Sequence, residues 1–187
     1  LTIPLAVALG CDTFDSASYI LYAKHDRYIG EDKTIHLPDI KYFSCTCEVC
    51  TKFNPKEILS LENEEKVNQI ALHNLFAIKE EVDRVKESIH EGRLWEYVMM
   101  KMHAHPKLFE TIDIFTKNPE YFLSTTPKFK EKAIFLFSKE DQYRPEVFAY
   151  QNTVMKFKTR KKVMVLTKNT ITKPAYLTNE YSILRNR

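Results

Sequence analysis

Glycine and long apolar runs are both scarce in this sequence. Only three of the 187 residues are glycine, so a glycine-rich loop that cradles phosphate groups is not expected. No apolar run approaches the roughly 18 residues that a membrane-spanning helix needs, and we expect no membrane partner. The apolar opening at residues 1–9 lacks the basic region of a signal peptide. We interpret the chain as a cytoplasmic protein, and this opening as the interior of a fold, either in a fragment or in one piece of a split protein.

Acidic residues are nearly absent from the C-terminal part. Residues 150–187 contain nine lysines and arginines but one acid, Glu180, which gives a net charge of +8. The first 149 residues carry a net charge of −5. A basic end on an acidic body suits an anionic partner such as nucleic acid. A solvated basic tail is the alternative, and charge alone does not decide between them.

Cysteine is also sparse, yet three of the four cysteines lie within six residues. They are Cys45, Cys47 and Cys50, whereas Cys11 stands alone. Thiols this close in a chain without secretory features are more often metal ligands than disulfide partners. A closed tetrahedral site needs a fourth ligand, and His73 lies 23 residues after Cys50. The pattern predicts one structural Zn²⁺ without an open position for water.

Other interpretations of the cysteine cluster are weaker. The histidines at 103 and 105 are rival fourth ligands, but we expect them to lie past a helix break and to have structural roles. Three cysteines without a metal are a further alternative. A zinc-ribbon DNA-binding module is disfavoured because the second pair of closely spaced cysteines is missing.

Hydrophobic periodicity predicts a mixed fold with one long amphipathic helix at about residues 64–90. We expect further helices at residues 1–9, 95–102 and 106–115, and one beginning at Arg144. The expected strands cover residues 10–15, 34–37, 42–43, 133–137 and 162–166, the cysteines lie in a loop at 45–60, and 117–132 form a linker.

A carboxylate at the end of the first expected strand is a candidate catalytic group. Asp15 follows Gly10–Phe14 and precedes a polar segment. Barrel enzymes place catalytic groups at the C-terminal ends of strands. Asp12 lies two residues earlier and would share a strand face with Asp15. A capping or turn role is the structural alternative for either residue.

Several motifs together resemble archaeal tRNA-guanine transglycosylases. The segment from Gly10 to Lys24 resembles the part of that family that carries its nucleophile. The other matching motifs follow in the family's order: Asp26-Arg27-Tyr28, the cysteine cluster, Leu72-His73-Asn74-Leu75 and Ala104-His105-Pro106. They cover about residues 5–106, and the match is looser beyond residue 130.

The resemblance implies an α/β fold, namely the C-terminal portion of a TIM (β/α)8 barrel with an inserted zinc subdomain. Residues 1–116 would hold this part of the barrel, with the zinc subdomain at about 40–75. Residues 133–187 would be a basic α+β segment that begins a following domain. Because the rest of the barrel is absent, the resemblance implies a missing N-terminal half or a partner chain, and a homodimer is a further expected partner.

The resemblance also implies an activity. The family exchanges a guanine in tRNA for a 7-deazaguanine base through a covalent ribosyl intermediate, and Asp15 matches its nucleophile. The archaeal branch acts on a D-loop guanine, tRNA position 15, with 7-cyano-7-deazaguanine, in archaeosine biosynthesis. Lys24, Arg27 and Ser16 are the candidate tRNA contacts; solvated surface charge for the two cations and turn capping for Ser16 are the alternatives. A wobble-position (queuine-type) enzyme and a non-catalytic, zinc-stabilised tRNA-binding or accessory subunit are the alternatives.

Overall fold

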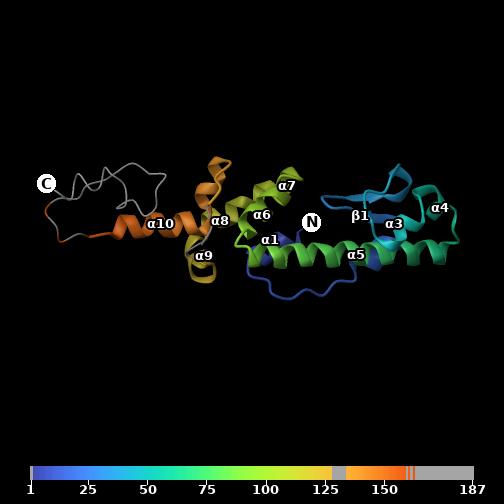
Figure 1. Ribbon diagram of the computed structural model, residues 1–187, viewed down its shortest axis with the longest axis horizontal. Helices are drawn as coiled ribbons and strands as arrows, with labels where there is room; N and C mark the ends of the chain where they lie inside the picture. The colour runs from blue at the N-terminus through green and yellow to red at the C-terminus, as the bar shows by residue number, and fades with distance from the viewer. Residues whose placement is uncertain (1, 128–133, 159, 161, 163–187) are drawn as a thin grey trace, which may run out of the picture. The chain divides into compact units, whose positions relative to one another are not determined.

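A computed structural model describes residues 2–127, 134–158, 160 and 162 (Figure 1). The chain divides into two units, residues 1–152 and 153–187. Among the described residues of the first unit, the regular elements are helices and one small hairpin. No helix in the described part of the chain combines the length and apolar character needed to cross a membrane.

Helices make up most of the described elements. The helices are α1 (Ile3–Ala8), α2 (Ser18–Lys24), α3 (Glu48–Lys52), α4 (Pro55–Ser60), α5 (Asn63–His90), α6 (Leu94–Met102), α7 (Pro106–Phe109), α8 (Asp113–Lys117), α9 (Pro119–Thr125) and α10 (Pro145–Lys156). Three 3-10 turns lie at Leu37–Asp39, Glu110–Ile112 and Lys139–Tyr143. Strands β1 (Arg27–Ile29) and β2 (Thr34–His36) pair antiparallel, with Tyr28 opposite Ile35.

The long helix α5 organises the first unit. Its N-terminal half lies against α2, α3 and β1, as Figure 1 shows at the right of the green helix. Its C-terminal end is set by Gly92, whose φ of +66° is accessible to glycine without strain. The amide of Arg93 donates to the carbonyl of Ser88 at 2.6 Å, which satisfies one of the last carbonyls of the helix.

Two hydrophobic clusters form the core. One belongs to residues 18–75, which we call the cysteine lobe, and the other joins α1, α6, α8 and α9. The first cluster comprises Ala23, Leu37, Val49, Ile58, Ile70 and Ala71. The second comprises Trp95, Val98, Met99, Met102, Ile112, Phe115 and Phe122. Each cluster buries the apolar side of short elements that would not be stable alone.

The expected helices are largely confirmed, whereas several expected strands are wrong. Residues 11–17 are an exposed coil, and 134–137 have no strand structure. The physical reason is the same in both places, because a strand requires a hydrogen-bonded neighbour and the described residues provide none there. The strand expected at 34–37 is confirmed for Thr34–His36, but it pairs with Arg27–Ile29 and not with residues 42–43. The strand expected at 162–166 lies outside the described residues, apart from residue 162.

The expected loops contain more helix than the sequence pattern indicated. The cysteine loop holds α3 and α4, and α4 begins with a capping box in which Asn54 and Glu57 each accept from the other's backbone amide. The helix expected at 106–115 is broken into α7, a 3-10 turn and α8. The expected linker at 117–132 contains α9, whose Phe122 is 3% exposed. The domain boundaries themselves stay a prediction.

Candidate metal centre

The cysteine lobe brings the four predicted zinc ligands together. Cys47 is the residue before α3, Cys50 lies within that helix, and Cys45 precedes it in the loop. His73 comes from α5 and is 2% exposed. Their ligand atoms all lie within 4.8 Å of one another. Because α3 turns two of the thiols in the same direction, a short segment can direct all three toward one histidine.

The spacing of the donor atoms fits zinc. Nδ1 of His73 lies 3.5 Å from Sγ of Cys47 and 3.4 Å from Sγ of Cys50. A tetrahedral ion with Zn–S of about 2.3 Å and Zn–N of about 2.0 Å separates sulfur from nitrogen by about 3.5 Å. The four side chains can therefore hold one metal ion, and three thiols with one imidazole are a donor set typical of structural zinc.

A hydrogen bond orients the imidazole. Nε2 of His73 lies 2.9 Å from the carbonyl oxygen of Ile29 and donates to it, which leaves Nδ1 unprotonated toward the sulfur atoms. Burial lowers the pKa of His73, although the bond to Ile29 acts in the opposite direction. The effect of burial is the larger, and the lowered pKa favours the neutral ring, the form that binds a metal.

The surroundings of two thiols, Cys45 and Cys50, disfavour the charged form unless a cation is bound. Burial raises the pKa of Cys50, and the neighbouring sulfurs of Cys47 and Cys45 raise it further. Burial also raises the pKa of Cys45. A divalent ion between the sulfurs would supply the missing positive charge and favour the thiolates.

An aromatic stack covers one side of the cluster. The ring of Tyr28 lies parallel to the His73 ring with a centroid distance of 3.7 Å, and Phe43 stacks on Tyr28 at 5.1 Å. The Tyr28 hydroxyl lies 3.5 Å from Sγ of Cys50. Burial, followed by this contact, raises the pKa of Tyr28. The stack excludes water from the imidazole and fixes its plane.

The neighbour of the histidine, Asn74, connects three segments of the lobe and is fully buried. Its Oδ1 accepts from the Ile29 amide at 2.8 Å, and its Nδ2 donates to the carbonyls of Tyr19 and Arg27 at 3.1 and 3.0 Å. Asn74 therefore joins α2 and β1 to α5. Asn74 belongs to the Leu72-His73-Asn74-Leu75 motif, but the sequence does not reveal that it joins these segments, because its partners are backbone groups 45 to 55 residues away.

The other candidate site residues lie outside this cluster. Asp15 and Ser16 are exposed in the coil before α2, and Oγ of Ser16 lies 2.6 Å from Oγ of Ser18. The Ser18 amide also donates to Oγ of Ser16 at 3.1 Å. Lys24 and Arg27 are exposed at the end of α2 and in β1. The structure thus brings together the four predicted metal ligands, whereas Asp15, Ser16, Lys24 and Arg27 lie at the surface.

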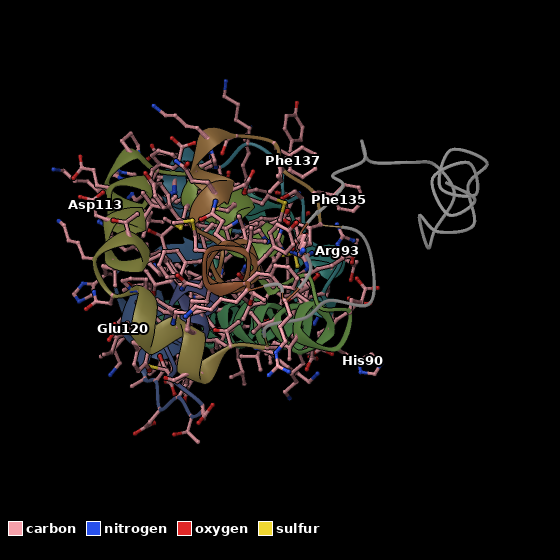
Figure 2. All side chains as sticks on the ribbon, turned by 90° about the vertical axis from the view of Figure 1, so that its left-hand side faces the viewer. His90, Arg93, Asp113, Glu120, Phe135 and Phe137 are labelled. Carbon is pink, nitrogen blue, oxygen red and sulfur yellow. The ribbon has the colours of Figure 1, made fainter. Side chains whose placement is uncertain are left out.

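A buried polar network, which the sequence analysis missed, holds the segment before α10. Trp95 donates from Nε1 to Asp141 at 2.8 Å. Arg144, with no exposed surface, pairs with Glu96 at 3.2 Å and with Glu146 at 3.1 Å. Its Nη1 also donates to the Phe135 carbonyl, while the rings of Phe135 and Phe137 point outward in Figure 2. The only sequence feature that could have pointed to this network is Arg144-Pro145-Glu146, in which a cation and an acid flank the proline that begins α10.

A second buried ion pair joins α5 to α6. Nζ of Lys101 lies 3.0 Å from Oε2 of Glu81, with side chains 5% and 9% exposed. Lys101 also donates to the carbonyl of Glu31 at 2.8 Å, and the Tyr97 hydroxyl donates to Glu81 at 2.9 Å. These bonds connect the hairpin of the cysteine lobe to the helical cluster.

Comparison with known proteins identifies the family. A family model described as queuine tRNA-ribosyltransferase matches residues 1–107, which include Asp15 and all four clustered side chains that could hold a metal ion. The chain belongs to this family. The resemblance found in the motifs is thereby confirmed, and the mostly helical structure with a small sheet is compatible with an α/β member of the tRNA-ribosyltransferases.

Similar curated proteins are archaeal members of the family. The tRNA-guanine(15) transglycosylase of Sulfolobus acidocaldarius is 44% identical over 163 residues, which are 86% of this chain and 33% of the relative. Its counterpart in Methanocaldococcus jannaschii is 41% identical over 173 residues, 91% of this chain and 26% of the relative. The chain therefore spans a third or less of the length of these tRNA-ribosyltransferases.

Proposed function

We propose that this chain is the nucleophile-bearing and zinc-binding part of an archaeal tRNA-guanine transglycosylase. Membership of the tRNA-ribosyltransferase family carries the proposal, because the matched region includes Asp15 within its motif. The relatives bear the name tRNA-guanine(15) transglycosylase, which favours exchange of a D-loop guanine over the wobble-position alternative. In this proposal 7-cyano-7-deazaguanine is the incoming base and archaeosine the eventual product.

The proposed reaction has two displacements at one carbon. A carboxylate oxygen of Asp15 attacks C1′ of the target ribose, the glycosidic bond breaks, and guanine leaves after taking up a proton. The deazaguanine nitrogen, after losing a proton, then attacks C1′ and releases the carboxylate. Two inversions give retention, as in retaining glycosidases. The target base must leave its stack before Asp15 can reach the sugar.

The proposed zinc has a structural role. Cys45, Cys47, Cys50 and His73 would complete a tetrahedral shell, so no position remains for substrate or water. Zinc would fix the cysteine loop onto α5, the helix against which α2 packs, and the coil with Asp15 leads directly into α2. Lys24, Arg27 and Ser16 are the proposed tRNA contacts beside it. The rest of a TIM barrel would come from polypeptide outside this chain.

The test is incorporation of radiolabelled guanine into tRNA by the complete enzyme. Asp15→Asn is expected to abolish exchange and to prevent a covalent tRNA adduct in denaturing gels, with zinc content unchanged. Asp32→Asn, an exposed carboxylate in the hairpin turn, is the matched control and should exchange normally. Exchange retained by Asp15→Asn would contradict the assignment. Absence of exchange in the parent, with tRNA and zinc still bound, would favour an accessory subunit.

A further inference from the structure

Cations occupy every second position at the end of α10 and just after it. Lys156, Lys158, Arg160 and Lys162 are all exposed. The sequence contains no aspartate or glutamate between Glu146 and Glu180. We call these four residues, together with Phe157, the basic stretch. Its charge is therefore concentrated locally and is not balanced by acids adjacent in sequence.

Four exposed lysines elsewhere in the chain, by contrast, lie within 4 Å of a carboxylate. Lys79 pairs with Asp83, Lys117 lies 3.2 Å from Asp113, and Lys107 lies 3.5 Å from Glu110. Within the part of the chain that the structure describes, none of the ion pairs involves the four cations of the basic stretch. Neighbouring like charges repel, so binding of a polyanion would relieve repulsion as well as add attraction.

An aromatic side chain lies among these cations. Phe157 stands between Lys156 and Lys158 and is 64% exposed. Exposed rings beside basic residues are typical of surfaces that bind single-stranded nucleic acid, because every base has a face on which a ring can stack. The combination supports a nucleic-acid ligand more strongly than the charge does alone.

We propose that the basic stretch binds the phosphate backbone of RNA, with Phe157 stacking on an unpaired base. In an extended chain, alternate side chains point to the same side, so the four cations would form a row along successive phosphates. Helices that lie on anionic membranes instead present their cations along one helical face. Here three of the four follow the end of α10, which favours RNA. This inference rests on the proposed function, which supplies tRNA as the RNA.

The salt dependence of tRNA binding tests the proposal. The complete enzyme carrying Asp15→Asn, which blocks turnover, is titrated with labelled tRNA between low and high salt. Replacing Lys156, Lys158, Arg160 and Lys162 together by glutamine should reduce the slope of log K against log[salt] by about 3 and weaken binding at least about tenfold, because each phosphate contact contributes about 0.7 to 0.9 to the slope. An unchanged slope and affinity would overturn the proposal.

A second set of four lysines provides the matched control. Each is 71–79% exposed and lies within 4 Å of a carboxylate, and replacing them by glutamine should leave the slope unchanged. The control positions are Lys79, Lys86, Lys107 and Lys117. An equal reduction in slope by the control set would show that total charge, and not the basic stretch, is responsible.

Phe157 separates stacking from apolar contact. Phe157→Tyr should retain affinity, whereas Phe157→Leu should weaken binding about 5-fold or more, since stacking contributes about 1–3 kcal/mol per base. Equal affinity of the two variants would remove stacking from the proposal.

A four-glutamine variant that keeps its tRNA affinity but loses binding to phosphatidylserine vesicles would assign the stretch to lipid. Loss of tRNA binding with normal exchange at saturating tRNA would support the inference and leave the catalytic assignment intact.

Discussion

Replacing Asn74 by leucine should separate the three segments that its amide joins. The substitution removes the acceptor of the Ile29 amide and the donor to the carbonyls of Tyr19 and Arg27. The partners are backbone groups that cannot be removed with it, so they stay in place without hydrogen bonds. A typical buried hydrogen bond contributes about 1 kcal/mol, and each stranded group costs about 1–3 kcal/mol. We expect a loss of about 3–5 kcal/mol in the free energy of unfolding.

The same substitution should weaken metal binding. Ile29 also accepts the hydrogen bond that orients the His73 imidazole, and Asn74 holds that strand in place. Loss of such an outer contact typically costs 10- to 100-fold in metal affinity. Urea unfolding followed by circular dichroism measures the stability, and competition with a chromogenic chelator measures the zinc affinity.

Asn68→Leu is the matched control for this prediction. Asn68 lies on the exposed side of the same helix, and we expect a change within about 0.5 kcal/mol because surface substitutions rarely exceed that. A loss of less than about 1 kcal/mol in Asn74→Leu, with unchanged zinc affinity, would contradict this role of Asn74.

Three further predictions concern metal, acid and the buried ion pair. Atomic emission should find one zinc per chain, retained in Cys11→Ser and lost in Cys50→Ser; retention in both would contradict the site. Burial raises the pKa of Asp141, but the bonds from Trp95 and the backbone outweigh it and lower the pKa. Its stabilising effect should therefore be present at neutral pH and disappear as pH falls through the lowered pKa. The urea midpoint of Asp141→Asn should lie below that of the parent at neutral pH, and the gap between the two midpoints should shrink in acid. A gap that is the same at both pH values would argue against this role of Asp141. Lys101→Met should cost about 3–5 kcal/mol by leaving Glu81 buried and unpaired, and adding Glu81→Leu should restore most of that stability in urea unfolding; strict additivity would refute the coupling.

Much of the metal site could be predicted because its signals are local. Cys45, Cys47 and Cys50 are closely spaced, and a helix of 28 residues offers few positions for a fourth ligand. The soft chemistry of the thiols then restricts the ion. What spacing could not show is the support around His73, since the Ile29 carbonyl, the Tyr28 ring and the Asn74 amide come together only after folding.

Strands were the least predictable elements. The segments 10–15 and 133–137 have the composition of buried strands, yet composition cannot supply a partner strand. The helices could be predicted because a helix satisfies its own backbone hydrogen bonds, and because its buried side appears in the sequence as a period of 3.6 residues. Even so, Pro106 to Lys117 broke into three pieces, a change that the apolar spacing does not reveal.

The sequence by itself determined the family motif around Asp15, the metal ligands, the long amphipathic helix and the uneven charge. All of these depend on residue type and on short spacings. Only the tertiary structure decided the partners of Asn74, of Arg144 and of the pair formed by Lys101 and Glu81. Such atoms must find partners wherever the folded chain places them, and distance along the chain gives no guide to which partners those will be.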